Sequence, residues 1–149
     1  MEFIPKNSEK KRVLVVDDNP ILLRTAKEML DEYYIVNIAV SASQAYSSIE
    51  KWRPDIILLD YEMPYENGME VLTKLRNDSY TKDIPVIFFT GSADREVVTK
   101  LVGLRPDGYL LKPPNKKRML KAIEDILSPA PVVTEETEDD IDETGDSEE

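Results

Sequence analysis

Short runs of apolar residues recur five times along the chain, and each is followed by a segment with helical spacing. The runs that we expect to form strands are residues 13–16, 34–40, 56–59, 85–89 and 109–111. After each run, apolar residues recur every three or four positions, which is the period of an amphipathic helix. Five strands that alternate with five helices predict an α/β fold with one parallel sheet, doubly wound in three layers.

The sequence also predicts where the helices begin. Pro20 suits the first position of a helix, with Asp18 or Asn19 as its cap, and Ser41 suits the cap of the second helix. The remaining three helices are expected after a loop that ends near Gly68, around residues 97–102, and over residues 115–127.

Polar side chains follow four of the five apolar runs, at the point where each run ends. They are Asp17 and Asp18, Asp60, Thr90 and Lys112. Each alone has an ordinary explanation as a helix cap, a turn or a strand end. However, the carboxyl ends of parallel strands share the edge of the sheet at which ligands bind. We therefore expect these side chains to form one site.

The residue types in this set suit phosphoryl transfer. Three carboxylates at one edge repel each other, and a hard divalent cation such as Mg²⁺, which prefers carboxylate oxygens, would relieve that repulsion. Lys112 could pair with Asp60 or with a phosphate oxygen. Thr90 supplies a hydroxyl group, and Gly91 would let the backbone come close. A carboxylate nucleophile, a metal, a hydroxyl group and an ammonium group are the parts that phosphoryl transfer needs.

Two residue types are missing from the 149-residue chain. Without histidine it has no imidazole base, no imidazole metal ligand and no phosphohistidine of its own. A phosphoryl group that passes through histidine must therefore come from another molecule. Without cysteine it has no disulfide, no catalytic thiolate and no Cys-ligated metal.

The net charge of −11 is concentrated at the C-terminus. Residues 135–149 hold ten of the 30 acids and no base, so the rest of the chain, with 19 lysines and arginines, is close to neutral. No broad basic surface is implied, and direct binding to nucleic acid is disfavoured. The apolar runs are strand-sized, far shorter than a membrane span, and we expect a cytoplasmic protein.

Four stretches of the sequence resemble the receiver domain of two-component response regulators. They are VLVVDDNP (13–20), PDIILLDYEMP (54–64) followed by Gly68, IPVIFFTG (84–91) and GYLLKPP (108–114). The resemblance covers residues 10–128 and implies a flavodoxin-like receiver fold with strand order 2-1-3-4-5. Residues 1–9 would then form an N-terminal extension and residues 129–149 a disordered acidic tail.

The resemblance implies a role for each acid of the site. Asp60 would be the phosphoacceptor and form an aspartyl phosphate. Asp18 and Asp60 would bind Mg²⁺ directly, joined by the backbone carbonyl of Glu62, and Asp17 would act mainly through water. We also hypothesise that the Glu62 side chain, an anion beside the site, adjusts the lifetime of the acyl phosphate.

Further residues would carry the signal outward. By the same resemblance, Thr90 and Lys112 would contact the phosphoryl group, and Lys112 would precede a cis proline. Tyr109 would turn inward when Thr90 moves, although it could equally be an ordinary half-buried strand aromatic. The readout face would comprise the fourth helix, the fifth strand and the fifth helix.

The resemblance also implies partners. The donor would be a sensor histidine kinase or a histidine phosphotransfer protein that docks around residues 19–26, and the downstream partner is an unidentified protein. The chain itself would not be an enzyme beyond phosphorylating itself and losing the phosphoryl group again. The acidic tail could be a solvated extension, an interaction arm or a linker.

Several alternative functions remain open. The chain could be the N-terminal part of a larger regulator. A Mg²⁺-dependent aspartyl phosphatase of the haloacid dehalogenase type uses similar residues, but it would want an aspartate at the position of Glu62. A structural adaptor would usually lack part of the acceptor set. A nucleotide- or flavin-binding module is disfavoured, because the turn over residues 17–20 has no glycine and carries two acids.

Overall fold

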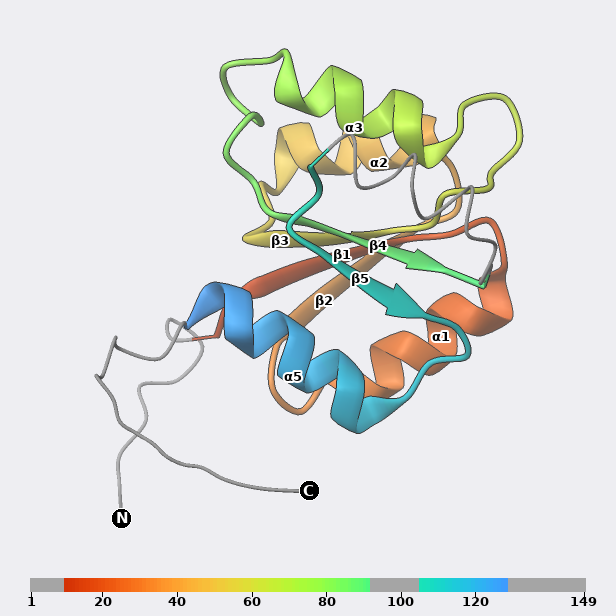
Figure 1. The fold of residues 1–149 in the computed structure, drawn as a ribbon, viewed down its shortest axis with the longest axis vertical. Coiled ribbons are helices and arrows are strands. Elements are labelled where there is room, and N and C mark those ends of the chain that lie inside the picture. The colour runs from red at the N-terminus through yellow and green to blue at the C-terminus, as the bar shows by residue number, and fades with distance from the viewer. Residues whose placement is uncertain (1–9, 92–104, 129–149) are drawn as a thin grey trace.

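The computed structural model describes residues 10–91 and 105–128, which form a parallel sheet flanked by helices (Figure 1). The strand order is β2-β1-β3-β4-β5. The strands are β1 (Arg12–Val16), β2 (Ile35–Ala39), β3 (Ile56–Leu59), β4 (Val86–Thr90) and β5 (Gly108–Leu111). The predicted parallel sheet and its 2-1-3-4-5 order are therefore confirmed.

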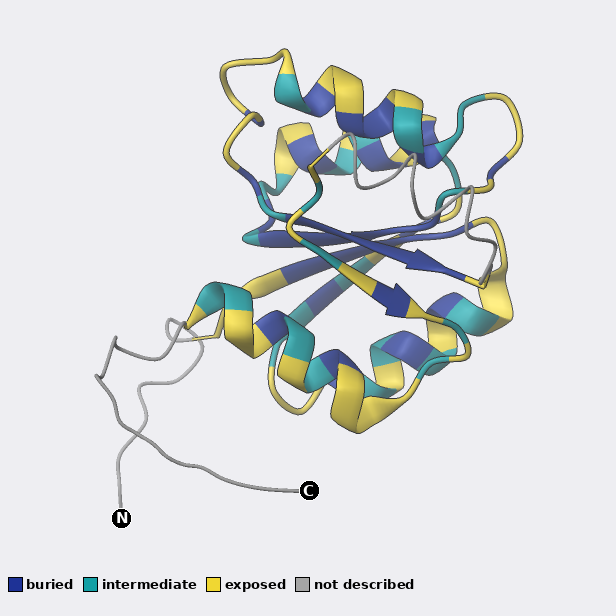
Figure 2. Ribbon diagram, in the orientation of Figure 1, coloured by how far each residue is buried: buried dark blue, intermediate teal, exposed yellow. Residues whose placement is uncertain are grey.

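The central strands are buried on both faces, which explains their unbroken apolar sequences. All residues of β3 and β4 are buried, and β1 is buried except at Arg12. Figure 2 shows this buried layer between the two helical layers. Side chains alternate between the faces, so that Leu14 and Val16 belong to one core cluster, whereas Val13 and Val15 belong to the other.

Helices cover both faces of the sheet. The described helices are α1 (Pro20–Leu30), α2 (Ala42–Lys51), α3 (Gly68–Arg76) and α5 (Lys116–Leu127). Helices α2 and α3 pack on one face, and α1 and α5 pack on the other (Figure 1). These three layers are the predicted doubly wound arrangement, and the fourth predicted helix, around residues 97–102, lies outside the described residues.

Each described helix begins at a residue whose side chain caps it. The Asn19 side chain accepts from the backbone of Ile21 and Leu22, so Asn19 rather than Asp18 caps α1. Ser41 caps α2, as predicted, and Asn115 caps α5. Because Asn19 takes the capping role, the Asp18 carboxylate remains available for the site.

The third helix begins one residue earlier than the loop prediction implied. Gly68 is its first residue, and Asn67 forms a capping box with Glu70. A Cβ atom at Gly68 would lie 2.5 Å from the carbonyl oxygen of Asp60 and 2.9 Å from Phe88. Only glycine fits at this position, so the start of α3 packs directly against the backbone that follows β3.

Within the described ranges, no helix combines the length and the apolar character that crossing a bilayer requires.

Candidate functional site

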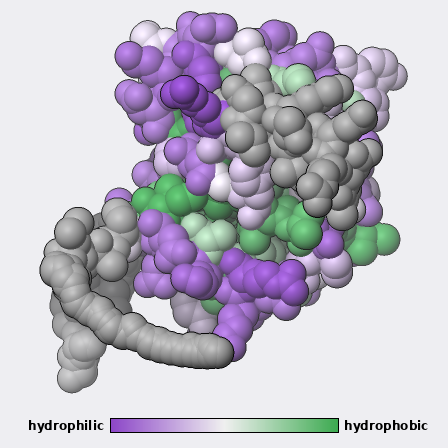
Figure 3. Space-filling model, viewed as in Figure 1, coloured by the Kyte–Doolittle hydropathy of each residue, from purple (hydrophilic) through white to green (hydrophobic). Residues whose placement is uncertain are grey.

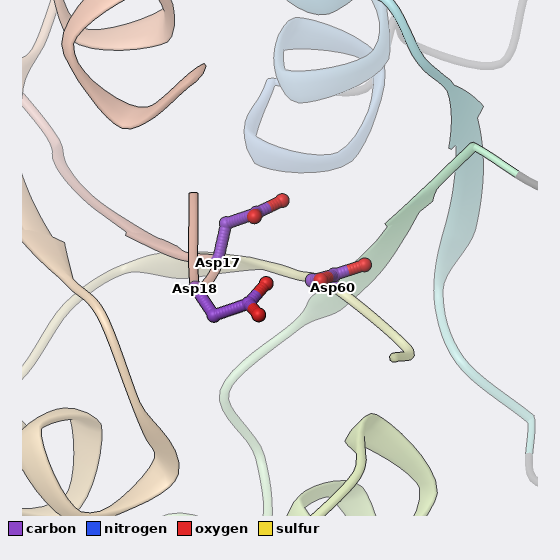
Figure 4. A group of neighbouring side chains, drawn as sticks. All are labelled: Asp17, Asp18 and Asp60. Carbon is purple, nitrogen blue, oxygen red and sulfur yellow. The ribbon is translucent and has the colours of Figure 1, made fainter. Parts of the chain in front are cut away.

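Three carboxylates meet at the carboxyl edge of the sheet. Asp17 and Asp18 follow β1, and Asp60 follows the neighbouring strand β3 (Figure 4). Oxygen atoms from all three lie within 4.8 Å of one another. Asp17 and Asp60 are buried and Asp18 is exposed. The site is thus an acidic group that opens to solvent on the side of Asp18.

Lys112, which follows β5, brings a positive charge into this group. Its Nζ lies 2.6 Å from Asp17 Oδ2 and 3.2 Å from Asp60 Oδ1. Asp17 Oδ2 is buried and makes no hydrogen bond to a described residue, so its contact with Lys112 is an ion pair with poor hydrogen-bond geometry. Asp17 Oδ1 accepts from the backbone N–H of Asn19 at 2.9 Å.

The crowding of acids changes the proton affinity of Asp60. Burial and the charge of Asp17 raise its pKa to about 6, against the opposing effect of Lys112. At neutral pH most Asp60 side chains are therefore ionised, but protonation needs only a mildly acidic solution. The pKa of Lys112 is raised: burial works to lower it, but the close contact with Asp17 and the charges of Asp60 and Asp17 outweigh burial.

An open cleft of about 750 Å³ surrounds these charges. Besides the three aspartates and Lys112, it is lined by Asn19, Tyr61, Glu62, Met63, Pro64, Asn67, Thr90 and Gly91. Thr90 is buried at the end of β4, where its carbonyl accepts from the backbone of Lys112 at 2.9 Å. The structure thus brings every residue of the predicted site to one cleft except Tyr109.

The role expected for Gly91 is not supported by its surroundings. A Cβ atom there would meet the Lys112 side chain at 3.6 Å, which is an ordinary contact. The glycine that permits a close backbone approach is Gly68, beneath the Asp60 carbonyl. The sequence offered a signal for this boundary, because Asn67 and Glu70 have the spacing of a capping box.

Tyr109 lies outside the cleft, on an edge strand. It is 40% exposed, and Leu111 on the same strand is 49% exposed. Figure 3 shows a hydrophobic band across the middle of the face seen in Figure 1, between two hydrophilic layers. The Lys112–Pro113 peptide bond is cis, as the resemblance implies.

Contacts that the sequence does not predict hold the amino ends of β4 and β5 together. Asp107 Oδ2 accepts from the backbone N–H of Val86 at 2.8 Å and from Arg76 at 3.0 Å. Arg76 also donates to the carbonyl of Ile84 at 2.8 Å. The sequence around Asp107 carries no pattern that identifies these long-range partners.

The donor set fits a hard divalent cation. All candidate ligands are oxygens, the net charge of three acids and Lys112 is negative, and the buried Asp17 Oδ2 has unused hydrogen-bonding capacity. Mg²⁺ favours such oxygen ligands and commonly retains several waters, for which the open cleft leaves room.

Together these features define a class of protein: a doubly wound α/β domain with an acidic, lysine-containing site at the carboxyl edge of its sheet. Residues 13–124 match the model of the response regulator receiver domain, and the chain belongs to this family.

The relatives include proteins both longer than this chain and of similar length. The nitrate/nitrite response regulator NarL of Escherichia coli K12 is 35% identical over 132 residues, which cover 87% of this chain but only 60% of NarL. The chain thus spans less than two thirds of that relative. The chemotaxis protein CheY of Halobacterium salinarum is 29% identical, with 79% of this chain and 98% of that protein covered.

Solved structures show the same fold. The chemotaxis protein CheY4 of Vibrio cholerae is similar with a TM-score of 0.73 and 28% identity, over 78% of this chain and 98% of CheY4. A CheY-like receiver domain from Methanospirillum hungatei is similar with a TM-score of 0.72 and 31% identity, over 80% of this chain and 94% of that domain. The predicted family is therefore confirmed.

Proposed function

We propose that this receiver domain accepts a phosphoryl group on Asp60 from a phosphohistidine donor, in a Mg²⁺-dependent reaction, and that the modification changes a protein-binding face. The observation that carries the proposal is the position of Asp60. It lies 3.2 Å from an ammonium group, with oxygens of two further carboxylates within 4.8 Å, in an open cleft.

The reaction at Asp60 is a displacement at phosphorus. One carboxylate oxygen forms a bond to phosphorus, while the bond between phosphorus and the donor's imidazole nitrogen breaks. The imidazole leaves with the bonding electrons and takes up a proton. The ionised form of Asp60 is the nucleophile, and with a pKa of about 6 it predominates at neutral pH.

Other residues would stabilise the negative charge of the transferred phosphoryl group. Lys112 already contacts Asp60 and would contact a phosphoryl oxygen once the carboxylate is phosphorylated. Asp18, Asp60 and the backbone carbonyl of Glu62 would bind Mg²⁺, with Asp17 acting through water. Bound Mg²⁺ would neutralise charge on the transferred phosphoryl group.

Thr90 and Tyr109 would relay the change. Thr90 lines the cleft, and its neighbour in the β4–β5 register is Leu111, two residues after Tyr109. In the structure Tyr109 is exposed, which fits the conformer without phosphate. Hydrogen bonding of Thr90 to the phosphoryl group would favour a second conformer with Tyr109 turned inward. The face that changes would include β5 and α5.

The partners follow from this chemistry. We expect the donor to be a sensor histidine kinase or a histidine phosphotransfer protein, since the chain has no histidine. We expect a downstream protein to bind the changed face, and the exchange to take place in the cytoplasm. We also propose that residues 10–128 fold as the receiver unit, without contributions from residues 1–9 or 129–149.

Phosphorylation with a small donor tests the proposal. The protein is incubated with acetyl phosphate and Mg²⁺, and its intact mass is measured. We expect the mass to increase by one phosphoryl group, and Asp60→Asn or removal of Mg²⁺ to abolish the increase. Asp83→Asn, at an exposed acid outside the cleft, is the matched control and should leave the increase intact.

Other outcomes would favour the alternatives. Repeated hydrolysis of a phosphomonoester without a stable adduct would indicate a phosphatase of the haloacid dehalogenase type. Failure to form an adduct, together with failure to bind Mg²⁺, would indicate an adaptor.

A further inference from the structure

A single side chain ties the loop between β3 and α3 to the neighbouring helices. Glu66 Oε2 accepts a hydrogen bond from the Tyr46 hydroxyl of α2 at 2.6 Å, and it lies 2.9 Å from Lys74 Nζ of α3. The same ammonium lies 5.6 Å from the centre of the Tyr46 ring. These three residues, which we call the Glu66 clamp, connect the loop to two helices through one carboxylate.

The protonation states of the clamp suit its geometry. The hydrogen bond from Tyr46, followed by that from Lys74, lowers the pKa of Glu66. Burial and the bond to Glu66 raise the pKa of Tyr46. At neutral pH the acceptor is therefore ionised and the phenol keeps its proton. A hydrogen bond to an ionised acceptor is stronger than one between neutral groups.

The residue next to the clamp has an unusual backbone conformation. Tyr65 has a φ of 68°, in the left-handed region that residues other than glycine rarely adopt. Its side chain is fully exposed, so side-chain packing does not explain this conformation. Such strain persists only where surrounding contacts hold it, and it often occurs at functional sites. The backbone N–H of Glu66 donates to the Pro64 carbonyl at 2.7 Å and so closes a tight turn around Tyr65. The Glu66 clamp adds a side-chain contact at the residue that closes this turn.

The clamped loop forms one wall of the acidic cleft. Five of its residues line that cleft: Tyr61, Glu62, Met63, Pro64 and Asn67. At the far end of the loop, the Gly68 N–H donates to the Tyr61 carbonyl at 2.7 Å. The loop is therefore fixed at Asp60, at Glu66 and at Gly68. A change at Glu66 would alter where Glu62 lies relative to Asp60.

Building on the proposed function, we propose that the Glu66 clamp positions the loop for metal binding. Glu66 itself touches neither the metal nor the phosphoryl group. It acts through the loop, by holding the backbone of Glu62 where its carbonyl can join Asp18 and Asp60 as a ligand. The affinity for Mg²⁺ would then depend on a hydroxyl group in α2, outside the cleft.

A single-atom change tests the clamp. Tyr46→Phe removes the hydroxyl group and keeps the ring, and we expect it to weaken Mg²⁺ binding roughly 3- to 10-fold in calorimetric titration, as the loss of one hydrogen bond would. In metal-free protein, hydrogen exchange of the Gly68 amide should accelerate by a similar factor. Tyr80→Phe is the control, because Tyr80 lies in the turn after α3, lines the same groove as Tyr46, and has a hydroxyl that bonds to no described residue. It should change neither quantity by more than about twofold.

A second pair of variants distinguishes an effect of Glu66 on the position of the loop from an effect on the overall stability of the fold. Glu66→Gln keeps an acceptor for Tyr46, whereas Glu66→Ala keeps none. We expect the affinity for Mg²⁺ to decrease in the order wild type, Glu66→Gln, Glu66→Ala, and this order should persist at temperatures at which all three are fully folded. Equal affinity in Tyr46→Phe, Glu66→Ala and wild type would overturn the clamp and leave the proposed function standing. Absence of Mg²⁺ binding in the wild type would overturn both.

Discussion

The ammonium group of Lys112 lies nearer to Asp17 than to Asp60: Nζ is 2.6 Å from Asp17 Oδ2 and 3.2 Å from Asp60 Oδ1. Asp17 is therefore the main counter-ion of Lys112 in this conformer, and Asp60 shares the lysine with it. Because Lys112 is shared, the negative charge of Asp60 is only partly balanced, which helps to explain its raised pKa. Several consequences can be measured.

Asp17→Asn should lower the pKa of Asp60. The charge of Asp17 is, after burial, the largest cause that raises this pKa, and its removal also allows Lys112 to pair fully with Asp60. A carboxyl NMR titration of metal-free protein measures the pKa directly. Asp83→Asn is the control. A value that stays near 6 in Asp17→Asn would contradict the sharing of Lys112.

The stability of metal-free protein should depend on the ionisation of Asp60. Its pKa is about 6 in the folded chain and 3.8 for an ordinary aspartate, so between these values the folded state binds more protons than the unfolded state. Stability should therefore rise as the pH falls from 7 towards 4, by up to about 3 kcal/mol from this group. Urea unfolding of wild type and Asp60→Asn isolates the effect. At pH 7 we expect Asp60→Asn to have a larger free energy of unfolding than wild type, because it carries no charge at this buried position. This difference should shrink at pH 4.5, and a difference that does not change with pH would refute the prediction.

Gly68→Ala should destabilise the fold. The new methyl group would lie 2.5 Å from the Asp60 carbonyl oxygen and 2.9 Å from Phe88, and the backbone cannot yield without moving the site. We expect a loss of about 1–3 kcal/mol in the free energy of unfolding. Gly108→Ala is the matched control, because its methyl group would meet side-chain atoms at 3.5 Å or more. Equal effects of the two substitutions in urea unfolding would show that the close approach at Gly68 is unimportant.

Asp107→Ala should weaken the attachment of β5. The substitution leaves the backbone N–H of Val86 and Nη2 of Arg76 without their acceptor. We expect the free energy of unfolding to fall by about 1–3 kcal/mol. Urea unfolding should show little change for Asp83→Ala, whose exposed side chain makes no such contacts among the described residues. If the free energy of unfolding falls no further than in Asp83→Ala, water must replace the Asp107 carboxylate as the acceptor, and the prediction is wrong.

Much of this fold could be predicted because its signals are local. The runs at residues 56–59 and 85–89 are apolar without alternation, as strands buried on both faces require, and Asn19, Ser41 and Asn115 have the chemistry of helix caps. The grouping of Asp60 with Asp17 followed from one rule about the carboxyl edges of parallel sheets.

The remaining features depend on partners that are distant in sequence. Whether Lys112 favours Asp17 or Asp60 is decided by distances of a few tenths of an ångström, which no motif encodes. Likewise, Tyr46 and Glu66 are twenty residues apart and meet only because α2 and α3 share a face of the sheet. Such contacts become visible only once the helices are placed.

Phosphorylation of Asp60 is tested most directly by identifying the modified residue. The protein is treated with acetyl phosphate and Mg²⁺ and then with borohydride, which reduces an aspartyl phosphate to homoserine, and the modified residue is located by peptide mass spectrometry. We expect homoserine at position 60, and none when Mg²⁺ is withheld. Modification of another residue, or of none while the protein remains folded, would contradict it.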